Sequence, residues 1–201
     1  MNKSKSGFNF DNTYLELNQK MYSNIDIKNT YLPTMKVFNN ELADILGLNT
    51  VFLNTEEGIK LLTGSINEEL EKGFTQAYSG HQFGHFTNLG DGRALMLGEH
   101  VTKSGERYDI QLKGSGSTPY SRRGDGKATL SSMLREFLIS EAVYYLNIPT
   151  TRSLAVLKTN ELVSWVKETK EDYDQAEYDS VVSSGENITS GLMALRLQEM
   201  G

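Results

Sequence analysis

Two runs near the middle of the chain read as strands, and the second of them alternates between apolar and polar residues. Residues 93–99 form the first strand and residues 107–113 its partner, with Lys103-Ser104-Gly105 as the hairpin turn. In the second strand the apolar face consists of Tyr108, Ile110 and Leu112, and the opposite face of Asp109, Gln111 and Lys113. Lys113 therefore ends a polar strand face directly before Gly114-Ser115-Gly116-Ser117, so its charge points into a site or into solvent.

Apolar spacing predicts two short helices in the first third of the chain. Residues 40–46 begin after Asn39 or Asn40 as the cap and end at Gly47, which can adopt the left-handed conformation. Their expected apolar stripe consists of Leu42, Ile45 and Leu46. Residues 55–62 form the second predicted helix, although Gly58 lies inside it.

The strongest helical pattern covers residues 130–146, with Thr129 as its cap and Pro149 beyond its end. Its apolar stripe consists of Leu130, Met133, Leu134, Phe137, Leu138 and Ala142. Glu136 lies close to the edge of this stripe, so it can face either a neighbouring element or solvent.

Other segments lack a regular period. Residues 78–86 and 89–94 are rich in glycine, histidine and aromatic residues, which indicates a shaped loop, and residues 118–128 form a turn-rich loop. Residues 1–13 are polar and predict a loose end. Residues 153–158 and 162–166 predict a second hairpin, and the acidic run 168–179 predicts a solvated segment.

Composition narrows the protein class. The chain has 201 residues and a formal net charge of −6, which disfavours a dedicated nucleic-acid binder. It has no cysteine, so disulfides, cysteine zinc sites and cysteine nucleophiles are excluded. No apolar run reaches the roughly 20 residues that span a bilayer, and the start has no secretory pattern. We therefore expect a cytoplasmic protein without a membrane or nucleic-acid partner.

Two glycine-rich turns place a cation after flexible backbone: Gly90-Asp91-Gly92-Arg93 and Gly124-Asp125-Gly126-Lys127. Backbone N–H groups beside Arg or Lys can cradle phosphate oxygens, but glycine turns are also ordinary punctuation. Neither is a Walker A loop, because Ala128 follows Lys127 and Ser121 occupies the position of the first glycine. Arg123-Gly124-Asp125 matches a cell-adhesion tripeptide, but we do not expect that role in a cytoplasmic protein.

Two further arrangements leave alternatives open. Lys113 at a strand end and Glu136 on the next helix match the logic of a kinase small lobe, yet both can equally be solvated. His81 and His85 stand four apart, but Gln82 replaces the glutamate of a zinc-protease motif and Gly80 and Gly84 disfavour a helix. Packing or hydrogen bonding is therefore the favoured role of these histidines, and we predict no metal ligands.

Several ordered motifs resemble the selenoprotein O family of pseudokinase-fold protein adenylyltransferases. They are residues 78–86, 89–94, 112–122, 124–126, 135–137 and 148–152. The resemblance covers about Tyr31 to Val166. It implies an α+β fold with a protein-kinase-like small lobe, consisting of an antiparallel sheet and a long helix, after an N-terminal helical extension.

The resemblance also implies a function: ATP binds in a flipped orientation, and AMP passes to protein hydroxyls. Matched by motif, the nucleotide-binding residues are Gly90, Gly92, Arg93, Lys113, Asp125 and Gly126, with Glu136 orienting Lys113. Cations would stabilise the charge on the leaving pyrophosphate, and Mg²⁺ would share that task.

The family pattern is interrupted after about Lys167. The phosphate-binding arginines and the large lobe with its catalytic aspartate and metal ligands have no counterpart, and Arg196 matches no motif. We therefore expect an N-terminal extension at 1–30, a nucleotide-binding lobe at 31–167 and a divergent tail at 168–201, without catalytic residues. A non-catalytic nucleotide-binding or interaction module, or a decayed fragment, is the alternative, and ordinary protein phosphorylation is a third possibility.

Overall fold

The computed structural model describes residues 4–25, 33–64, 73–82, 85–88, 90–121 and 124–160. The chain divides into two units, Met1–Val163 and Ser164–Gly201, and the whole second unit lies outside the described residues. The predicted strand at 162–166 and the acidic run at 168–179 lie outside them as well. Both therefore stay predictions, as do the boundaries of the three expected regions.

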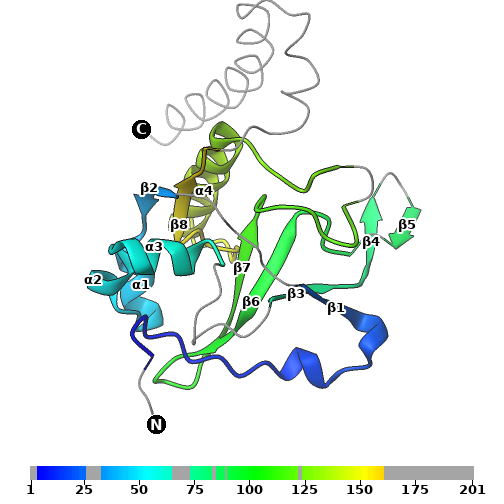
Figure 1. Ribbon diagram of the computed structural model, residues 1–201, viewed down its shortest axis with the longest axis horizontal. Coiled ribbons are helices and arrows are strands. Elements are labelled where there is room, and N and C mark those ends of the chain that lie inside the picture. Colours follow the sequence, from blue (N-terminus) through cyan, green and yellow to red (C-terminus); the bar gives the residue numbers. More distant parts are fainter. Residues whose placement is uncertain are drawn as a thin grey trace, which may run out of the picture. The chain divides into compact units, whose positions relative to one another are not determined.

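A four-stranded antiparallel sheet lies at the centre of the described part (Figure 1). Its spatial order is β1 (Tyr22–Ile25), β3 (Gly73–Gln76), β6 (Ala94–Val101) and β7 (Arg107–Lys113). Two smaller sheets pair β2 (Thr34–Phe38) with β8 (Ala155–Lys158), and β4 (Ser79–Gln82) with β5 (His85–Asn88). Together with the helices, these antiparallel sheets confirm the α+β class.

The central hairpin β6–β7 forms as the alternation predicts. Tyr108, Ile110 and Leu112 are half-buried, whereas the residues between them are exposed. At the turn, Gly105 has φ +88° and its N–H donates to Thr102 O at 3.0 Å. Lys113 pairs with Ala94 across the two strands, because an irregularity between Met96 and Gly98 shifts the register that the turn alone would give.

Three short helices cover the core: α1 (Asn40–Leu46), α2 (Thr50–Leu53) and α3 (Glu56–Leu62). Asn39 Oδ1 caps α1 by accepting from Leu42 N–H at 3.0 Å, and Gly47 ends it with φ +72°. Gly58 is tolerated in α3 because a Cβ there would lie 2.1 Å from Phe52 O in the neighbouring helix. The buried core includes Leu42, Ala43, Leu46, Leu53, Leu61, Leu62, Leu95 and Leu97.

The expected apolar stripe of α1 is wrong at one position. Ile45 is 44% exposed, while Ala43 is completely buried. The helix is only two turns long, so its buried face is narrow and the small alanine lies at its centre.

The N-terminal segment is not the loose end that its polar composition suggests. Phe8 is only 5% exposed in the core, and Val101 N–H donates to Asn9 O at 2.9 Å, so the segment pairs with the end of β6. Buried His100 joins the layers: its Nδ1 accepts from Asn9 N–H at 3.0 Å, so Nε2 carries the hydrogen and donates to Leu46 O at 2.8 Å. The polar composition of residues 1–13 does not predict this packing, because backbone hydrogen bonds form regardless of side-chain polarity.

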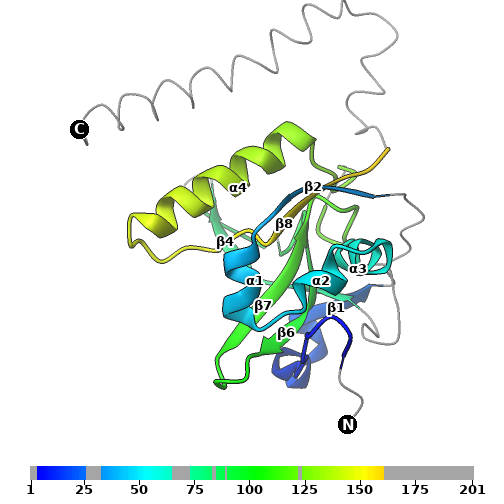
Figure 2. The same cartoon turned by 90° about the vertical axis from the view of Figure 1, so that its left-hand side faces the viewer.

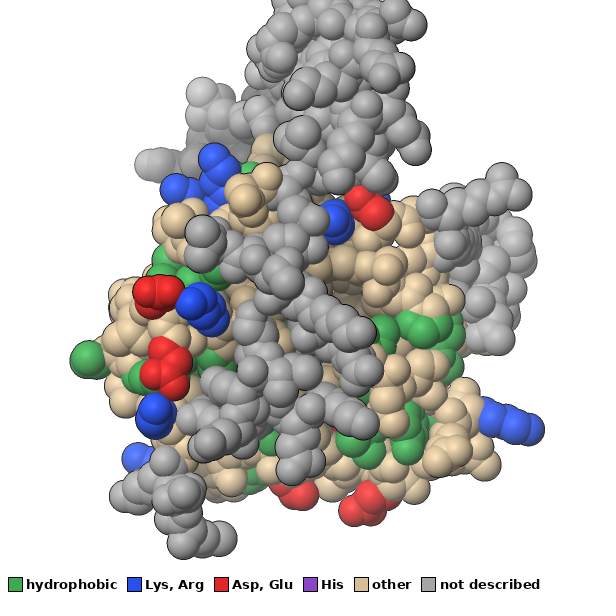
Figure 3. Space-filling model, in the orientation of Figure 1, with side chains coloured by type: hydrophobic (Ala, Val, Ile, Leu, Met, Phe, Trp, Pro, Cys, Tyr) green, Lys and Arg blue, Asp and Glu red, His purple; other side chains and the backbone are tan. Residues whose placement is uncertain are grey.

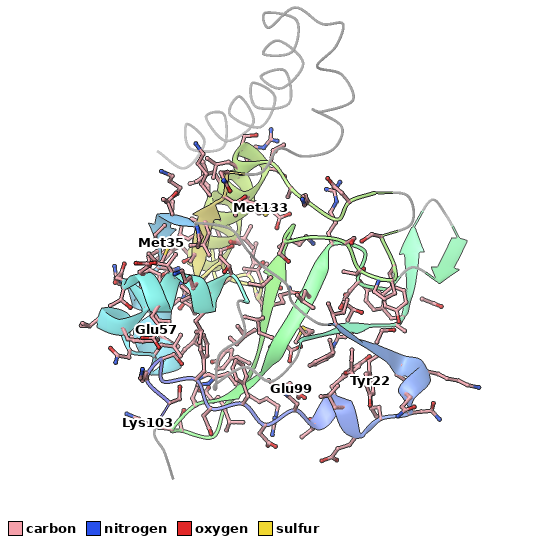
Figure 4. All side chains as sticks on the ribbon, viewed as in Figure 1. Tyr22, Met35, Glu57, Glu99, Lys103 and Met133 are labelled. Atoms are coloured by element: carbon pink, nitrogen blue, oxygen red, sulfur yellow. The ribbon has the colours of Figure 1, made fainter. Side chains whose placement is uncertain are left out.

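The expected helical extension consists of two 3-10 helices, Thr13–Glu16 and Gln19–Met21. The buried carboxylate of Glu99, labelled in Figure 4, accepts from Thr13 Oγ1 at 2.9 Å and from Tyr14 N–H at 2.7 Å. The extension is thereby fixed to β6.

One expectation about pairing needs correction, and another stays untested. β8 pairs antiparallel with β2, more than a hundred residues earlier in the chain, and the two lie side by side in Figure 2. The predicted pairing of β8 with residues 162–166 lies outside the described residues. Residues 79–82 and 85–88 form a hairpin instead of an irregular loop, with His81 opposite Phe86. The strands β4 and β5 form a separate sheet and do not join the central one. Their sequences lack the apolar–polar alternation from which a strand is predicted.

The long helix α4 (Leu130–Tyr145) has the predicted cap, since Thr129 Oγ1 accepts from Ser132 N–H at 3.4 Å. However, none of its residues is fully buried, and Leu134 and Leu138 of the predicted stripe are 38% and 55% exposed. Within the part of the chain that the structure describes, α4 packs mainly on β8. Two of the six residues of the predicted stripe are therefore exposed there.

Polar contacts fix the C-terminal half of α4. Arg152 Nε and Nη2 donate to the two carboxylate oxygens of Glu141 at 3.0 and 2.5 Å, and Asn39 Nδ2 donates to the same carboxylate at 2.7 Å. The Arg152 guanidinium also stacks 3.6 Å from the centre of the Tyr144 ring. This Arg152–Glu141 pair joins α4 to the start of α1 and to the segment that leads into β8.

Candidate functional site

The turn Gly90–Arg93 leads into β6 and is fixed to the end of β3. Asp91 forms a reciprocal pair with Gln76: Asp91 N–H donates to Gln76 O at 2.9 Å, and Asp91 Oδ2 accepts from Gln76 N–H at 2.8 Å. The Asp91 carboxylate also accepts a hydrogen bond from the Tyr78 hydroxyl. Asp91 is only 6% exposed, so its side chain is a fixed internal part of the turn.

A second loop holds the same turn from the other side. Thr118 Oγ1 donates to Asp91 O at 2.5 Å, and Ser121 Oγ donates to Gly92 O at 2.5 Å. Gly90 has φ +58°, and a Cβ at this position would lie 2.7 Å from both Gln76 O and the Tyr120 ring. Glycine is therefore required by the close approach of three segments as well as by backbone conformation.

These hydrogen bonds change what the turn can offer a phosphate. The N–H groups of Gly90, Asp91 and Gly92 already donate to Tyr78 O, Gln76 O and Gly90 O. The turn as described therefore does not present these amides as an open cradle. Its remaining donor group is the exposed side chain of Arg93.

The strand pairing brings the two candidate motifs together. Gly114 N–H donates to Arg93 O at 2.9 Å, directly beside the Lys113–Ala94 pair. Arg93 and Lys113 are both exposed. Arg93 lies opposite Gly114, one position beyond the Ala94–Lys113 pair. Two exposed cationic residues therefore lie near the same end of the hairpin, Lys113 at the end of β7 and Arg93 directly before β6.

The loop with Asp125 and Gly126 packs against the glycine segment after Lys113. Ala128 N–H donates to Gly114 O at 3.2 Å, and a bridge joins Ser115 to Lys127. Gly126 has φ +67°, and a Cβ there would lie 1.9 Å from Gly116 O. Asp125 Oδ1 accepts from Lys127 N–H at 3.0 Å, which fixes the turn. The structure therefore places Asp125 and Gly126 next to the Lys113 strand end.

Glu136 is exposed on α4, and no ion pair between it and Lys113 is found among the described residues. The predicted pairing of these two side chains stays a prediction. The nucleotide-binding roles of Gly90, Gly92, Arg93, Lys113, Asp125 and Gly126 stay predictions in the same way.

Burial dominates the electrostatics of the turn. Loss of solvent raises the pKa of Asp91, although the bonds from Gln76 and Tyr78 and the positive charge of Lys113 oppose the rise. The pKa of the Tyr78 hydroxyl is raised, first by burial and then by the charge of Asp91. Asp91 thus carries a costly buried charge at the point where the two candidate motifs meet.

Sequence reasoning passed over Asp91 and Tyr120. Both lie inside the quoted motifs, but neither motif alone shows that the carboxylate turns inward or that the tyrosine ring covers Gly90. Asp91 lies between two glycines, and a Thr-Pro-Tyr-Ser segment follows at residues 118–121. This pattern indicates that the two segments pack together only when the pairing of the hairpin strands is known.

Two other observations bear on cofactors and environment. Among the described residues no group of three or more His, Asp or Glu side chains is arranged to hold a metal ion. No helix in the described ranges is long and apolar enough to cross a bilayer.

Comparison with known proteins gives consistent matches. Residues 5–177 match the family described as "Protein adenylyltransferase SelO". The chain is 57% identical over 164 residues to protein nucleotidyltransferase YdiU of Clostridium perfringens (strain SM101 / Type A), which covers 80% of this chain and 33% of that protein. The protein of the same name from Brevibacillus brevis is 55% identical over 157 residues, covering 78% of this chain and 32% of the relative.

The chain thus spans about a third of the length of the curated relatives that it matches. The matched region includes the turn Gly90–Arg93, the β6–β7 hairpin and α4. The chain belongs to the SelO family of protein adenylyltransferases.

Proposed function

We propose that this chain is the ATP-binding part of a protein adenylyltransferase, in which AMP passes from ATP to Ser, Thr or Tyr hydroxyls of protein substrates. The observation that carries the proposal is the bond from Gly114 N–H to Arg93 O, because it joins the glycine turn to the Lys113 strand end. Family membership supports the type of reaction. The complete activity, its substrates and a cytoplasmic location all belong to the proposal.

In this proposal the phosphates are held by side chains more than by the amides of the first turn. Arg93 and Lys113 supply the positive charge, and the 124–126 loop closes the pocket beside them. Glu136 orients Lys113 once α4 and the strand end approach each other. Mg²⁺, held by residues outside the described part, would supply further charge at the leaving pyrophosphate.

Nucleotide binding is tested by calorimetric titration of the 201-residue chain with ATP and Mg²⁺. We expect Lys113→Ala to weaken binding by about tenfold or more, since a charge-assisted phosphate contact contributes roughly 1.5–3 kcal/mol. Lys103→Ala is the matched control, because Lys103 lies at the opposite end of the same hairpin (Figure 4). Equal effects of the two substitutions would remove Lys113 from the site.

The reaction type is tested with the full-length Clostridium perfringens relative and ATP labelled at either the α- or the γ-phosphate. Adenylyl transfer leaves the α-label on protein, whereas ordinary phosphorylation leaves the γ-label. Replacement of the lysine that aligns with Lys113 should abolish transfer.

The second candidate is a non-catalytic nucleotide-binding module. The exposure of Leu134 and Leu138 on α4 favours it for the chain alone, because an uncovered apolar face is typical of an interaction surface. Binding of ATP by this chain without label transfer would support the module.

A further inference from the structure

Two hydroxyl groups join the Thr-Pro-Tyr-Ser segment to the glycine turn. Thr118 Oγ1 donates to Asp91 O at 2.5 Å and accepts from Tyr120 N–H at 3.1 Å. Ser121 Oγ donates to Gly92 O at 2.5 Å and accepts from Thr118 N–H at 2.8 Å. A hydroxyl has one hydrogen to donate and can also accept. Each of the two side chains therefore connects a carbonyl of the turn to an amide of the segment.

The same segment is fixed to two other parts of the chain. Ser121 O accepts from Gly124 N–H at 3.0 Å, which attaches the segment to the 124–126 loop. The hydroxyl oxygens of Tyr120 and Ser23 lie 3.2 Å apart, which attaches the segment to β1. Ser121 is thus bonded to the glycine turn through its side chain and to the 124–126 loop through its backbone.

These bonds orient the backbone of Arg93. The peptide group before Arg93 is held because its oxygen, Gly92 O, accepts from Ser121 Oγ. The peptide group after Arg93 is held because Arg93 O accepts from Gly114 N–H at 2.9 Å. Without the first bond, the glycine before Arg93 would leave the backbone free to rotate. The exposed Arg93 side chain therefore leaves the backbone in a direction that these bonds set.

The distribution of charge makes the place of a single cation matter. On the face shown in Figure 3, the Lys and Arg side chains that are drawn are interspersed with Asp and Glu instead of gathered by sign. With charges mixed in this way, binding of phosphate depends on individual cations held in place more than on a broad positive surface.

We propose that Thr118 and Ser121 are positioning residues of the nucleotide site: their hydroxyl groups hold Arg93 in place relative to the 124–126 loop, so that both contact the phosphates of one nucleotide. The turn and the loop are then ordered before the nucleotide arrives, and the entropy cost of ordering them does not reduce its affinity. This inference rests on the proposed function, because it requires Arg93 to contact phosphate.

A double-mutant cycle tests the inference by calorimetric titration of the 201-residue chain with ATP and Mg²⁺. We expect Ser121→Ala to weaken ATP binding about fivefold, the size expected when a bond that pre-organises a contact is lost. In a chain that already carries Arg93→Ala, the same substitution should weaken binding by less than about 1.5-fold, because Ser121 acts through Arg93. A merely structural role would give the same factor in both chains.

Thr118 provides a second position with a conservative rescue. Thr118→Val removes the hydroxyl but keeps the shape of the side chain, so it should also weaken ATP binding about fivefold. Thr118→Ser keeps the hydroxyl and should bind ATP as the wild type does. Thr102→Val is the matched control: Thr102 Oγ1 accepts from Glu106 N–H at 3.1 Å at the opposite end of the β6–β7 hairpin, and its loss should leave ATP binding unchanged.

The outcomes separate this inference from the proposed function. If wild-type protein binds ATP, the positioning role is overturned by equal factors in the two chains, by no effect of Ser121→Ala and Thr118→Val, or by no effect of Arg93→Ala alone. Loss of folding in both hydroxyl variants, as judged by circular dichroism, would make their role structural and overturn the inference as well. A folded wild-type chain that does not bind ATP would refute the proposed function itself.

Discussion

The Arg152–Glu141 pair should contribute strongly to stability, and Glu141→Gln tests this. The side chains of Arg152 and Glu141 are 9% and 13% exposed, and two hydrogen bonds join them. Hydrogen bonds to charged groups contribute about 1.5–3 kcal/mol, and loss of one partner leaves a nearly buried guanidinium. Glutamine keeps the shape and part of the bonding, so we expect the free energy of unfolding to fall by about 2–3 kcal/mol.

Urea denaturation followed by circular dichroism measures this change. Glu57→Gln is the matched control, since the Lys5–Glu57 pair has side chains that are 67% and 57% exposed. Exposed pairs contribute little, so the control should change the free energy of unfolding by less than about 0.5 kcal/mol.

The same pair predicts a dependence on pH. The hydrogen bonds from Arg152 lower the pKa of Glu141 in the folded chain; burial opposes this decrease, and the bond from Asn39 and the positive charge of Arg152 add to it. A group whose pKa is lowered by folding stabilises the fold above its unfolded pKa, about 4.3 for glutamate, and this contribution is lost as the pH falls through the folded value. The difference between wild type and Glu141→Gln should therefore be full near neutral pH and shrink below about pH 4. A difference that does not change with pH, or one equal to that of Glu57→Gln, would refute the reasoning.

Two further substitutions test the packing by the same denaturation assay. Gly126→Ala should lower the free energy of unfolding by about 3 kcal/mol, because it combines φ +67° with a Cβ 1.9 Å from Gly116 O, whereas Gly105→Ala, with φ +88° and open space, should cost about 1 kcal/mol. Phe8→Ala should cost about 3–5 kcal/mol because Phe8 is 5% exposed, whereas Leu17→Ala, at 48% exposure, should cost less than about 0.5 kcal/mol. Similar costs within either pair would contradict the described packing.

Local features of the fold could be predicted from sequence because each depends on neighbouring residues. The caps at Asn39 and Thr129, the turn at Gly105 and the two faces of β7 were all found in this way. The opposition of Arg93 and Gly114 does not follow from the turn alone, because it depends on the register shift between Met96 and Gly98.

Features that depend on distant contacts could not be predicted. The pairing of β8 with β2 and the burial of Phe8 join segments with no shared local pattern. The inward position of Asp91 depends on Gln76 and Tyr78, which lie in a different part of the chain. Contact between Glu136 and Lys113 depends on where α4 lies, which no local pattern determines.

The central claim is that nucleotide binds at the junction of the glycine turn and the Lys113 strand end. The most direct test follows backbone amide NMR signals of the ¹⁵N-labelled chain during titration with ATP. We predict that the largest shifts occur at Gly92, Arg93, Lys113, Gly114 and Gly126. Saturable shifts confined to α1–α3, or no shifts in a folded chain, would contradict the claim.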